Sequence, residues 1–320
     1  MKVLFVCSGN NKDGINIIIR NQGESLEKEG VDVDYFTIRG KGIASYVKHI
    51  FLLKEHLSRN QYDIIHAHYS FSAFTASLAG CKPLVVSLMG SDSNSNIFWK
   101  IILKLSARMF WDKTIVKSLS IKQSINIKDA ILIPNGINLQ KIVPAERSKG
   151  FSQNKIIIFV SDPTRHSKNF DLAQKAISLL EDNTILFKVI YSKSHQEVIN
   201  EINSAHALLL TSRWEGSPNV VKEAMSCNCP VVSTNVGDVK WLFGEEQGYF
   251  ITSFKPEDVA DKIRQAINYS DLYGRTKGRK RIIELGLESK MIARRIIKEY
   301  NEVLNNQKKA KQHQVVKEIY

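Results

Sequence analysis

The chain has 320 residues, of which 43% are hydrophobic and 24% charged, with a formal net charge of +13. This length suits two domains of ordinary size, and the composition is that of a globular protein. No apolar run approaches the roughly 20 residues that cross a bilayer, and no secretory signal sequence is visible. The positive charge favours an anionic partner, which could be nucleic acid, anionic lipid or a phosphorylated substrate.

The first part of the chain alternates short apolar runs with helical patterns. The predicted strands are 2–7, 31–38, 63–67, 84–89, 114–116 and 131–133. The predicted helices between them are 15–29, 44–58, 72–78 and 97–109. This rhythm of strand and helix is typical of a parallel sheet that is covered by helices on both faces.

A polar segment at 141–154 is predicted to be a linker, and the alternation then restarts. The strands predicted after it are 155–160, 186–191, 207–211 and 230–234. The sequence therefore predicts an α/β protein with two doubly wound domains, 1–145 and 150–288, and a ligand cleft between them. A helix near 289–304 can pack back on the first domain, and the basic tail 305–320 is expected to fray.

The segment 212–225 is the most informative part of the chain. Ser217 fits the N-cap of the helix that starts there, and Pro218 fits its first position, where a missing N–H costs nothing. The N–H groups of residues 219–221 would then be free to bind an anion. Glu215 precedes this helix and Glu223 lies inside it. The arrangement suits a ligand that is anionic at one end and rich in hydroxyl groups elsewhere, such as a nucleotide sugar.

Two cations lie in the loop that opens the second domain. Arg165 and Lys168 follow the strand at 155–160 and precede a helix. Cations in such a loop can grip a diphosphate, and arginine can do so with two hydrogen bonds. Taken alone, the loop is better explained as a solvated basic turn. The two downstream glutamates, at an equivalent sheet edge, favour the binding interpretation.

Candidate polar residues also follow strands of the first domain. His66 and His68 share one face of the third predicted strand, and His68 is expected to face the cleft. No nearby cysteine or carboxylate pair completes a metal site around them. Asp92 follows the fourth strand in a G-S-D loop, which fits either substrate hydroxyl binding or a simple turn. Gly9 follows the first strand, where backbone amides can meet an anion although G-x-G-x-x-G is absent.

The stretch 97–111 is unusually apolar and carries Lys100, Lys104 and Arg108 at intervals of four. Such a helix can lie on a membrane surface through hydrophobic insertion and attraction to anionic lipid. The alternative is a core helix with one solvated edge. The basic segment 275–281 lacks the features of a nucleic-acid module, so no specific nucleic acid partner is expected.

These residues resemble the retaining glycosyltransferases of family 4. Glu215 and Glu223 match the E-x7-E motif of that family, within E-G-S-P-N-V-V-K-E-A-M. Further matches in the right order are I-I-H-A-H at 64–68, G-S-D at 90–92, I-P-N-G-I at 133–137 and P-V-V-S-T-N-V-G at 230–237. The resemblance implies the GT-B fold, in which two Rossmann-like domains face each other across a cleft.

The resemblance also implies a role for each candidate residue. Arg165 and Lys168 would neutralise the diphosphate leaving group of a UDP- or GDP-linked sugar. Glu223 would bind the ribose, and Glu215 would contact the donor sugar. The residues expected to take part in catalysis are His68, Arg165, Lys168 and Glu215. The residues expected to bind the donor are Gly9, Arg165, Lys168, Glu215, Gly216, Ser217, Asn219, Val220 and Glu223. On the acceptor side the expectation is His68, which would contact the transferred sugar, and Asp92.

Members of this family work without a metal ion, so neither metal nor cofactor is expected beyond the nucleotide sugar. The expected acceptor is a saccharide or a lipid-linked saccharide, and the expected process is cell-surface polysaccharide synthesis. The four cysteines have no zinc or thioredoxin spacing, which indicates free thiols in a reducing cytoplasm. The enzyme is therefore expected in the cytoplasm, with a peripheral position on the inner face of the membrane if 97–111 docks there.

Two features depart from the family pattern. Met89 stands where many members have a histidine, and the loop after the first strand reads Gly9-Asn10-Asn11 in place of the common Gly-Gly. These departures bear on donor orientation and on the acceptor side. The alternatives to a transferase are a nucleotide-sugar epimerase on the same fold and a non-catalytic protein that binds anionic lipid or RNA.

Overall fold

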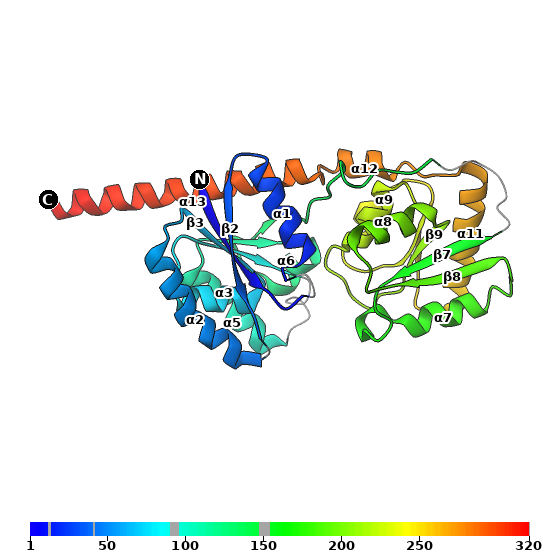
Figure 1. Ribbon diagram of the computed structural model, residues 1–320, viewed down its shortest axis with the longest axis horizontal. Helices are drawn as coiled ribbons and strands as arrows, with labels where there is room; N and C mark the ends of the chain where they lie inside the picture. Colours follow the sequence, from blue (N-terminus) through cyan, green and yellow to red (C-terminus); the bar gives the residue numbers. More distant parts are fainter. Residues whose placement is uncertain (12–13, 41, 90–95, 147–153, 320) are drawn as a thin grey trace. The chain divides into compact units, whose positions relative to one another are not determined.

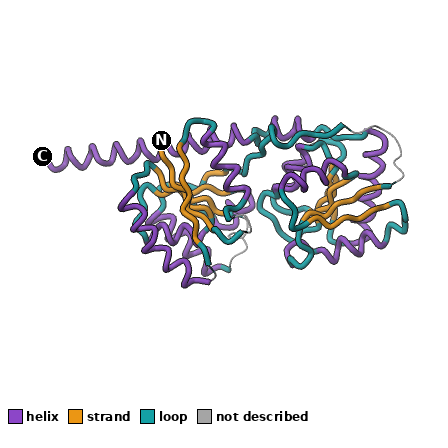
Figure 2. Tube along the Cα trace, in the orientation of Figure 1, coloured by secondary structure: helices purple, strands orange, loops and turns teal. Residues whose placement is uncertain are grey.

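The chain forms two compact units (Figure 1). The computed structural model describes residues 1–11, 14–40, 42–89, 96–146 and 154–319. One unit comprises Met1–Gly136 and Ser289–Tyr320, and the other comprises Ile137–Glu288. In each unit the strands form one layer between helices (Figure 2). Each unit thus has the doubly wound architecture that the sequence predicts.

The division between the units comes earlier than the sequence pattern places it. That pattern assigns residues 137–145 to the first domain, whereas they belong to the second unit. Ile137 pairs with Glu288 in a parallel bridge, and the Arg279 guanidinium donates to the carbonyl oxygens of Leu139 and Ile142. These contacts are distant in sequence, so the composition of the segment could not predict them. The expected linker at 141–154 lies partly outside the described residues.

The first unit is built on a parallel sheet of six strands in the order β2-β1-β3-β4-β5-β6. Its strands are β1 (Lys2–Ser8), β2 (Asp32–Ile38), β3 (Ile64–His68), β4 (Leu84–Leu88), β5 (Lys113–Val116) and β6 (Ile131–Leu132). Its described helices are α1 (Ile17–Glu27), α2 (Gly42–Arg59), α3 (Ser70–Leu78), α5 (Ile97–Phe110), α6 (Leu119–Ile125) and α13 (Ser289–Ile319).

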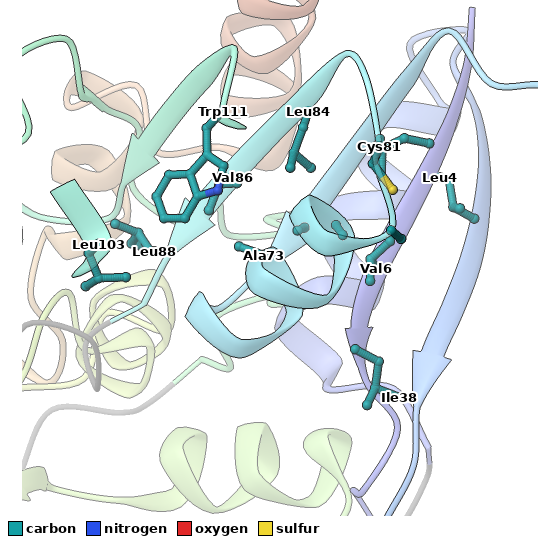
Figure 3. Packing of buried hydrophobic residues seen from close by; sticks show 14 of the residues in the cluster. Leu4, Val6, Ile38, Ala73, Cys81, Leu84, Val86, Leu88, Leu103 and Trp111 are labelled. Carbon is teal, nitrogen blue, oxygen red and sulfur yellow. The ribbon is translucent and has the colours of Figure 1, made fainter. Parts of the chain in front are cut away.

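Alternation along the strands divides the apolar residues of this unit between two layers. Leu4 and Val6 of β1 point to one face and pack with residues of α2, α3 and α5 (Figure 3). Phe5 points to the other face, where its ring lies 5.3 Å from that of His66. Successive side chains of a strand alternate between faces, so both faces of this sheet are apolar and both need helices.

Helix α13 covers the second face and brings the end of the chain back to the first unit. The Tyr300 hydroxyl lies 2.5 Å from Nδ1 of His66, and Nε2 of His66 lies 2.8 Å from the Ser87 hydroxyl. Burial holds the pKa of His66 well below its usual 6.5, so the ring is neutral. The helix then continues to Ile319. The expectation of a frayed tail from 305 is therefore wrong for the residues that the structure describes.

The second unit has a parallel sheet of five strands in the order β11-β10-β9-β7-β8. Its strands are β7 (Lys155–Val160), β8 (Ile185–Ile190), β9 (Ala207–Leu210), β10 (Val231–Thr234) and β11 (Tyr249–Thr252). Its described helices are η1 (His166–Lys168), α7 (Phe170–Ser178), α8 (His195–Ser204), α9 (Asn219–Ser226), α10 (Val239–Phe243), α11 (Pro256–Tyr273) and α12 (Gly278–Glu284). Buried residues of α7 and α11 form a core with β7 and β9 on one face of the sheet.

Each sheet contains a point at which the strand order reverses. In the first unit the reversal lies between β1 and β3, and in the second it lies between β7 and β9. The connections that leave two such strands run to opposite sides, which leaves a crevice at their carboxyl ends. Open α/β sheets bind ligands at this place. The fold therefore marks one edge of each unit as the place where a ligand would bind.

We expect Tyr300→Phe to lower the free energy of unfolding of the first unit by about 1–3 kcal/mol, because a buried nitrogen of His66 loses its partner. Amide hydrogen exchange of strands β1 and β3 would measure the change. Tyr273→Phe is the matched control, because Tyr273 is 53% exposed and lies in the other unit. Unchanged exchange in Tyr300→Phe would contradict the role given to this contact.

Candidate functional site

The strand reversal of the second unit carries an ion pair between two loops that are far apart in sequence. Lys168 follows β7 and Glu215 follows β9, and the Lys168 ammonium lies 2.5 Å from Oε1 of Glu215. The Ser212 hydroxyl donates to the same carboxylate oxygen at 2.8 Å. Both charged side chains are largely buried, with relative exposures of 12% and 16%. The pair is therefore held in one geometry at the edge where a ligand would bind.

Backbone contacts fix the two loops against each other. The Arg213 N–H donates to the carbonyl of Ser167 at 2.8 Å. The Thr211 hydroxyl donates to the carbonyls of Lys168 and Asn169, at 3.1 and 3.0 Å. Asn169 has a φ of 53°, a left-handed conformation that asparagine tolerates better than most residues. The loop at 161–169 is thus an ordered part of the site.

Arg165 lies in the same loop as Lys168, but its side chain is not held by an ion pair as that of Lys168 is. Its side chain is exposed, and its guanidinium forms no hydrogen bond or ion pair with the described residues. Lys168 is already matched by Glu215, so of these two cations Arg165 is the one whose charge is available to an added anion. The sequence pattern treats these two cations as equivalent, and the structure places them in different surroundings.

Helix α9 begins one residue later than the sequence predicts. Pro218 is the N-cap, and no side chain caps the helix, so the expectation that Ser217 is the N-cap is wrong. The Val221 N–H donates a hydrogen bond to the Pro218 carbonyl at 3.2 Å. The N–H groups of Asn219 and Val220 have no acceptor among the described residues. Two amides, in place of the expected three, are open at the helix start.

One glycine, Gly237, lets the backbone approach closely at this helix start. Gly237 follows β10 with a φ of +59°, and a Cβ there would lie 2.3 Å from the carbonyl oxygen of Gly216. No side chain fits in that space, and the left-handed conformation also favours glycine. The packing of Gly237 on Gly216 therefore fixes the loop between Glu215 and α9.

Glu223 is the second carboxylate of the predicted motif, and its partner is a residue that the sequence interpretation missed. Nε2 of His195 lies 3.0 Å from Oε1 of Glu223. His195 is the first residue of α8, which the Ser194–Glu197 capping box fixes at its start. The hydrogen bond to Glu223 raises the pKa of His195, partly offset by burial. A histidine just after a strand, at the edge where Glu223 was expected, is the signal that could have found it.

A buried pair of charged residues lies behind the same helix. The Lys222 side chain is completely buried, and burial lowers its pKa to about 8. Asp238 follows Gly237 and is also buried, which raises the pKa of its carboxyl, while the Lys222 charge acts in the opposite direction. No sequence pattern indicates that a lysine beside a site glutamate would be buried. Its burial places fixed charge directly beneath the loop that carries the motif.

In the first unit, Gly9 and His68 lie at the carboxyl ends of the two strands that flank the reversal. A Cβ on Gly9 would lie 2.8 Å from Cβ of Thr37, so packing between strands already requires glycine there. His68 is 1% exposed and stacks on His66 with ring centroids 4.3 Å apart. Burial lowers the pKa of His68, and neither ring nitrogen has a partner among the described residues. Asp92 lies outside the described residues.

The units therefore differ in how they hold the predicted residues. The second unit brings Lys168 and Glu215 into contact and orders the loop that also carries Arg165. The first unit keeps His68 beneath its surface, next to a second buried residue that the sequence interpretation missed. This is Lys117, which is 2% exposed, and its ammonium lies 3.5 Å from Oε1 of Gln22. A sugar can contact His68 only after the atoms that cover the ring have moved.

Two family models match successive parts of the chain. The model described as glycosyltransferase family 4 matches residues 12–141, and the model described as glycosyl transferases group 1 matches residues 187–284. Together they cover most of the chain. The chain belongs to the family 4 glycosyltransferases. The second match contains Glu215, Glu223 and His195.

Relatives of known name support this family. The chain is 26% identical over 246 residues to a Bacillus subtilis protein provisionally named as the teichuronic acid biosynthesis glycosyltransferase TuaC. That match covers 66% of the chain but only 63% of the relative's length. The chain is also 22% identical over 316 residues to the Escherichia coli UDP-Gal:alpha-D-GlcNAc-diphosphoundecaprenol alpha-1,3-galactosyltransferase, which covers 82% of the chain and 81% of that enzyme.

The structural comparison identifies the fold. Sucrose-phosphate synthase from Thermosynechococcus elongatus matches with a TM-score of 0.78 and 15% identity, over 95% of this chain and 99% of that one. At so low an identity the likeness concerns the fold alone. It confirms the predicted GT-B fold with two Rossmann-like domains.

The pair of His195 and Glu223 predicts a pH dependence in the stability of the second unit. The folded state raises the pKa of His195 above its ordinary 6.5. The pair therefore stabilises the unit fully below pH 6.5, and its contribution is lost as the pH rises through the folded-state pKa. We expect the difference in unfolding free energy between the parent and His195→Ala to be largest at low pH and to shrink across that window.

Urea unfolding at a series of pH values would measure this difference. Glu223→Gln is the matched variant, because it keeps the side chain but removes the charge that raises the pKa of His195. Glu223→Gln should therefore also remove the pH-dependent part of the unfolding free energy. A difference that grows with rising pH would contradict the expected sign of the effect.

Proposed function

We propose that the protein is a retaining glycosyltransferase that moves a sugar from a UDP- or GDP-linked donor to a saccharide or lipid-linked acceptor. The main support is the Lys168–Glu215 pair, which is fixed at the strand reversal of the second unit beside exposed Arg165. Two further features belong to the proposed donor site. They are the open amides of Asn219 and Val220 and the carboxylate of Glu223. Cations and amides suit a diphosphate, and carboxylates suit the hydroxyl groups of ribose and sugar.

The chemistry requires charge stabilisation more than a protein nucleophile. The bond between the anomeric carbon and the diphosphate oxygen breaks, and its electron pair stays on the diphosphate. The acceptor oxygen forms the new bond on the same face of the sugar, and its proton passes to the departing diphosphate oxygen. Arg165, Lys168 and the amides of α9 would stabilise the negative charge as it develops. No metal ion is part of this proposal.

Glu215 and Glu223 would hold the two ends of the donor. Glu215, already oriented by Lys168 and Ser212, would accept hydrogen bonds from the sugar hydroxyls. Glu223 would accept them from the ribose, with His195 fixing its carboxylate. His68 would contact the transferred sugar from the first unit. The printed name of the E. coli relative supports the substrate class, because that enzyme uses UDP-Gal and a diphosphoundecaprenol-linked acceptor.

We further propose that the enzyme acts in the cytoplasm on the inner face of the membrane, in cell-surface polysaccharide synthesis. The four cysteines are buried and form no disulfide within the described residues, which supports a reducing compartment. In the part of the chain that the structure describes, no helix is long and apolar enough to cross a membrane. Residues 97–111 would then contact the membrane surface.

The identity of the donor can be measured directly. A thermal-shift panel with UDP, GDP, ADP, their common sugar derivatives and NAD would identify it. A ligand at 100 times its dissociation constant should stabilise the protein by about 2.7 kcal/mol. We expect one uridine or guanosine nucleotide to give this shift and Glu223→Ala to lose it. Salt-sensitive RNA binding without any nucleotide shift would favour the binding-protein alternative instead.

Arg165→Ala and Lys168→Ala are each expected to lower turnover by roughly 100- to 1,000-fold, the range found when one group that stabilises developing charge is removed. Release of the nucleoside diphosphate would report the rate. Lys175→Ala is the control, because Lys175 is exposed on the next helix and pairs with exposed Asp171. Full activity in both site variants would exclude this arrangement of the leaving-group site.

A further inference from the structure

The outer side of α2 carries a stripe of exposed apolar residues. Ile43, Val47 and Phe51 are 71%, 47% and 68% exposed. Residues four apart lie on the same face of a helix, so the three form one row along the solvent side. Leu53, on the opposite side, packs into the core against the sheet. The core therefore does not use this row.

Helix α5 carries a second row of the same kind. Its apolar side chains with exposures from 48% to 75% are Ile97, Phe98, Ile101, Leu105 and Met109. Leu103 and Ser106 are the residues of this helix that are fully buried. An ordinary core helix would bury its large apolar side chains. Packing within the described chain does not account for this row.

The two rows belong to one surface, because α3 lies between α2 and α5 and contacts both (Figure 1). Tyr46 of α2 lies 5.1 Å from Phe71 of α3, and Phe71 lies 5.1 Å from Trp99 of α5, measured between ring centroids. All three helices cover the same face of the sheet. Their outer sides therefore face away from the sheet together. We call this the α2–α5 surface and define it by the eight exposed residues of the two rows.

The charges around the α2–α5 surface are almost all positive. Lys48 and Lys54 flank the row on α2, and Lys104 and Arg108 flank the row on α5. Glu55 is the acidic residue of the two helices, and Arg59 already pairs with it at 2.8 Å. An apolar row between cations is the pattern of a helix that lies in the interface of an anionic membrane.

The prediction of a cationic stripe along α5 is partly wrong. The Lys100 ammonium donates to the Ser124 hydroxyl of α6 at 2.8 Å, so this lysine faces the protein. Lys104 and Arg108 remain exposed. The contact surface of α5 is therefore its apolar row with these two cations at one border, a composition that favours insertion as well as charge attraction.

The position of the rows relates them to the reaction edge of the first unit. Helix α2 begins shortly after β2 ends at Ile38, and α5 ends at Phe110, just ahead of β5. Both helices thus run opposite to the strands. Their first turns, with Ile43, Ile97 and Phe98, lie toward the carboxyl edge of the sheet, the edge that also carries His68.

We propose that α2 and α5 together form a docking surface for an anionic lipid bilayer. Docking would bring the carboxyl edge of the first unit to the lipid surface, where a lipid-linked acceptor could reach it; this consequence rests on the proposed function. A second copy of the chain fits less well, because a symmetric contact would set the same lysines against one another. Lysine is also depleted at protein interfaces relative to other surfaces.

The test uses the full-length protein and vesicles of phosphatidylcholine with and without phosphatidylglycerol. We expect binding to the anionic vesicles that weakens with salt and by roughly tenfold for each phenylalanine removed in Phe51→Ser and Phe98→Ser. Phe254→Ser is the matched control, because Phe254 is 53% exposed in the second unit. It should bind as the parent does. Circular dichroism would verify that all three variants are folded.

Other results would overturn the proposal. Loss of binding in Phe98→Ser alone would show that α5 docks without α2. Equal binding by the parent and both variants would exclude the surface altogether. A lipid-free dimer of the parent that becomes monomeric in Phe51→Ser would assign the surface to a second copy.

Nucleotide binding separates this proposal from the proposed function. Phe51→Ser should keep the thermal shift with the donor nucleotide, because α2 lies in the first unit and the donor residues lie in the second. Vesicle binding in a protein that binds no nucleotide sugar would leave the docking surface standing and remove the transferase. A thermal shift with a nucleotide, without any vesicle binding, would support the transferase and exclude the docking surface.

Discussion

The ion pair between Lys168 and Glu215 is the interaction on which the proposed donor site depends. It joins the loops that follow β7 and β9, the two strands at which the order of the second sheet reverses. Parallel strands deliver the starts of successive loops to one edge, and the reversal opens a crevice there. The pair fixes a cation and a carboxylate in that crevice before any ligand arrives. Preorganised charge of this kind is the main means of stabilising a transition state.

The residues around the pair show how the fold maintains this charge. Gly237 allows a close backbone contact with Gly216 that any side chain at residue 237 would block, and this contact holds the loop ahead of α9. Lys222 and Asp238 are buried behind the same helix, with burial lowering the pKa of the first and raising that of the second. Burying charges costs free energy that ordinary packing would not require. Such groups are commonly concentrated at functional sites, and here they lie beneath the E-x7-E segment.

The first unit shows a different use of the same architecture. Its stacked histidines, His66 and His68, are buried and neutral, whereas its outer helical layer has exposed apolar rows. His66 links the sheet to α13 through Tyr300, so the helix that ends the chain helps to close this unit. The apolar rows of α2 and α5 begin near the edge that carries His68. Under the two proposals, this unit would combine the acceptor edge with the membrane contact.

The sequence by itself determined the fold class, the strands of both parallel sheets apart from β11, and the segment that carries the two glutamates. It could do so because hydrophobic alternation, helix-start residues and a spaced motif are local properties of the chain. Only the tertiary structure decided that His195 pairs with Glu223, that Lys100 bonds to Ser124 and that residues 137–145 belong to the second unit. It also placed Pro218, and not Ser217, at the N-cap position of α9. Each of these depends on which surfaces meet after folding, and such contacts between distant residues leave no periodic or local signal in the sequence.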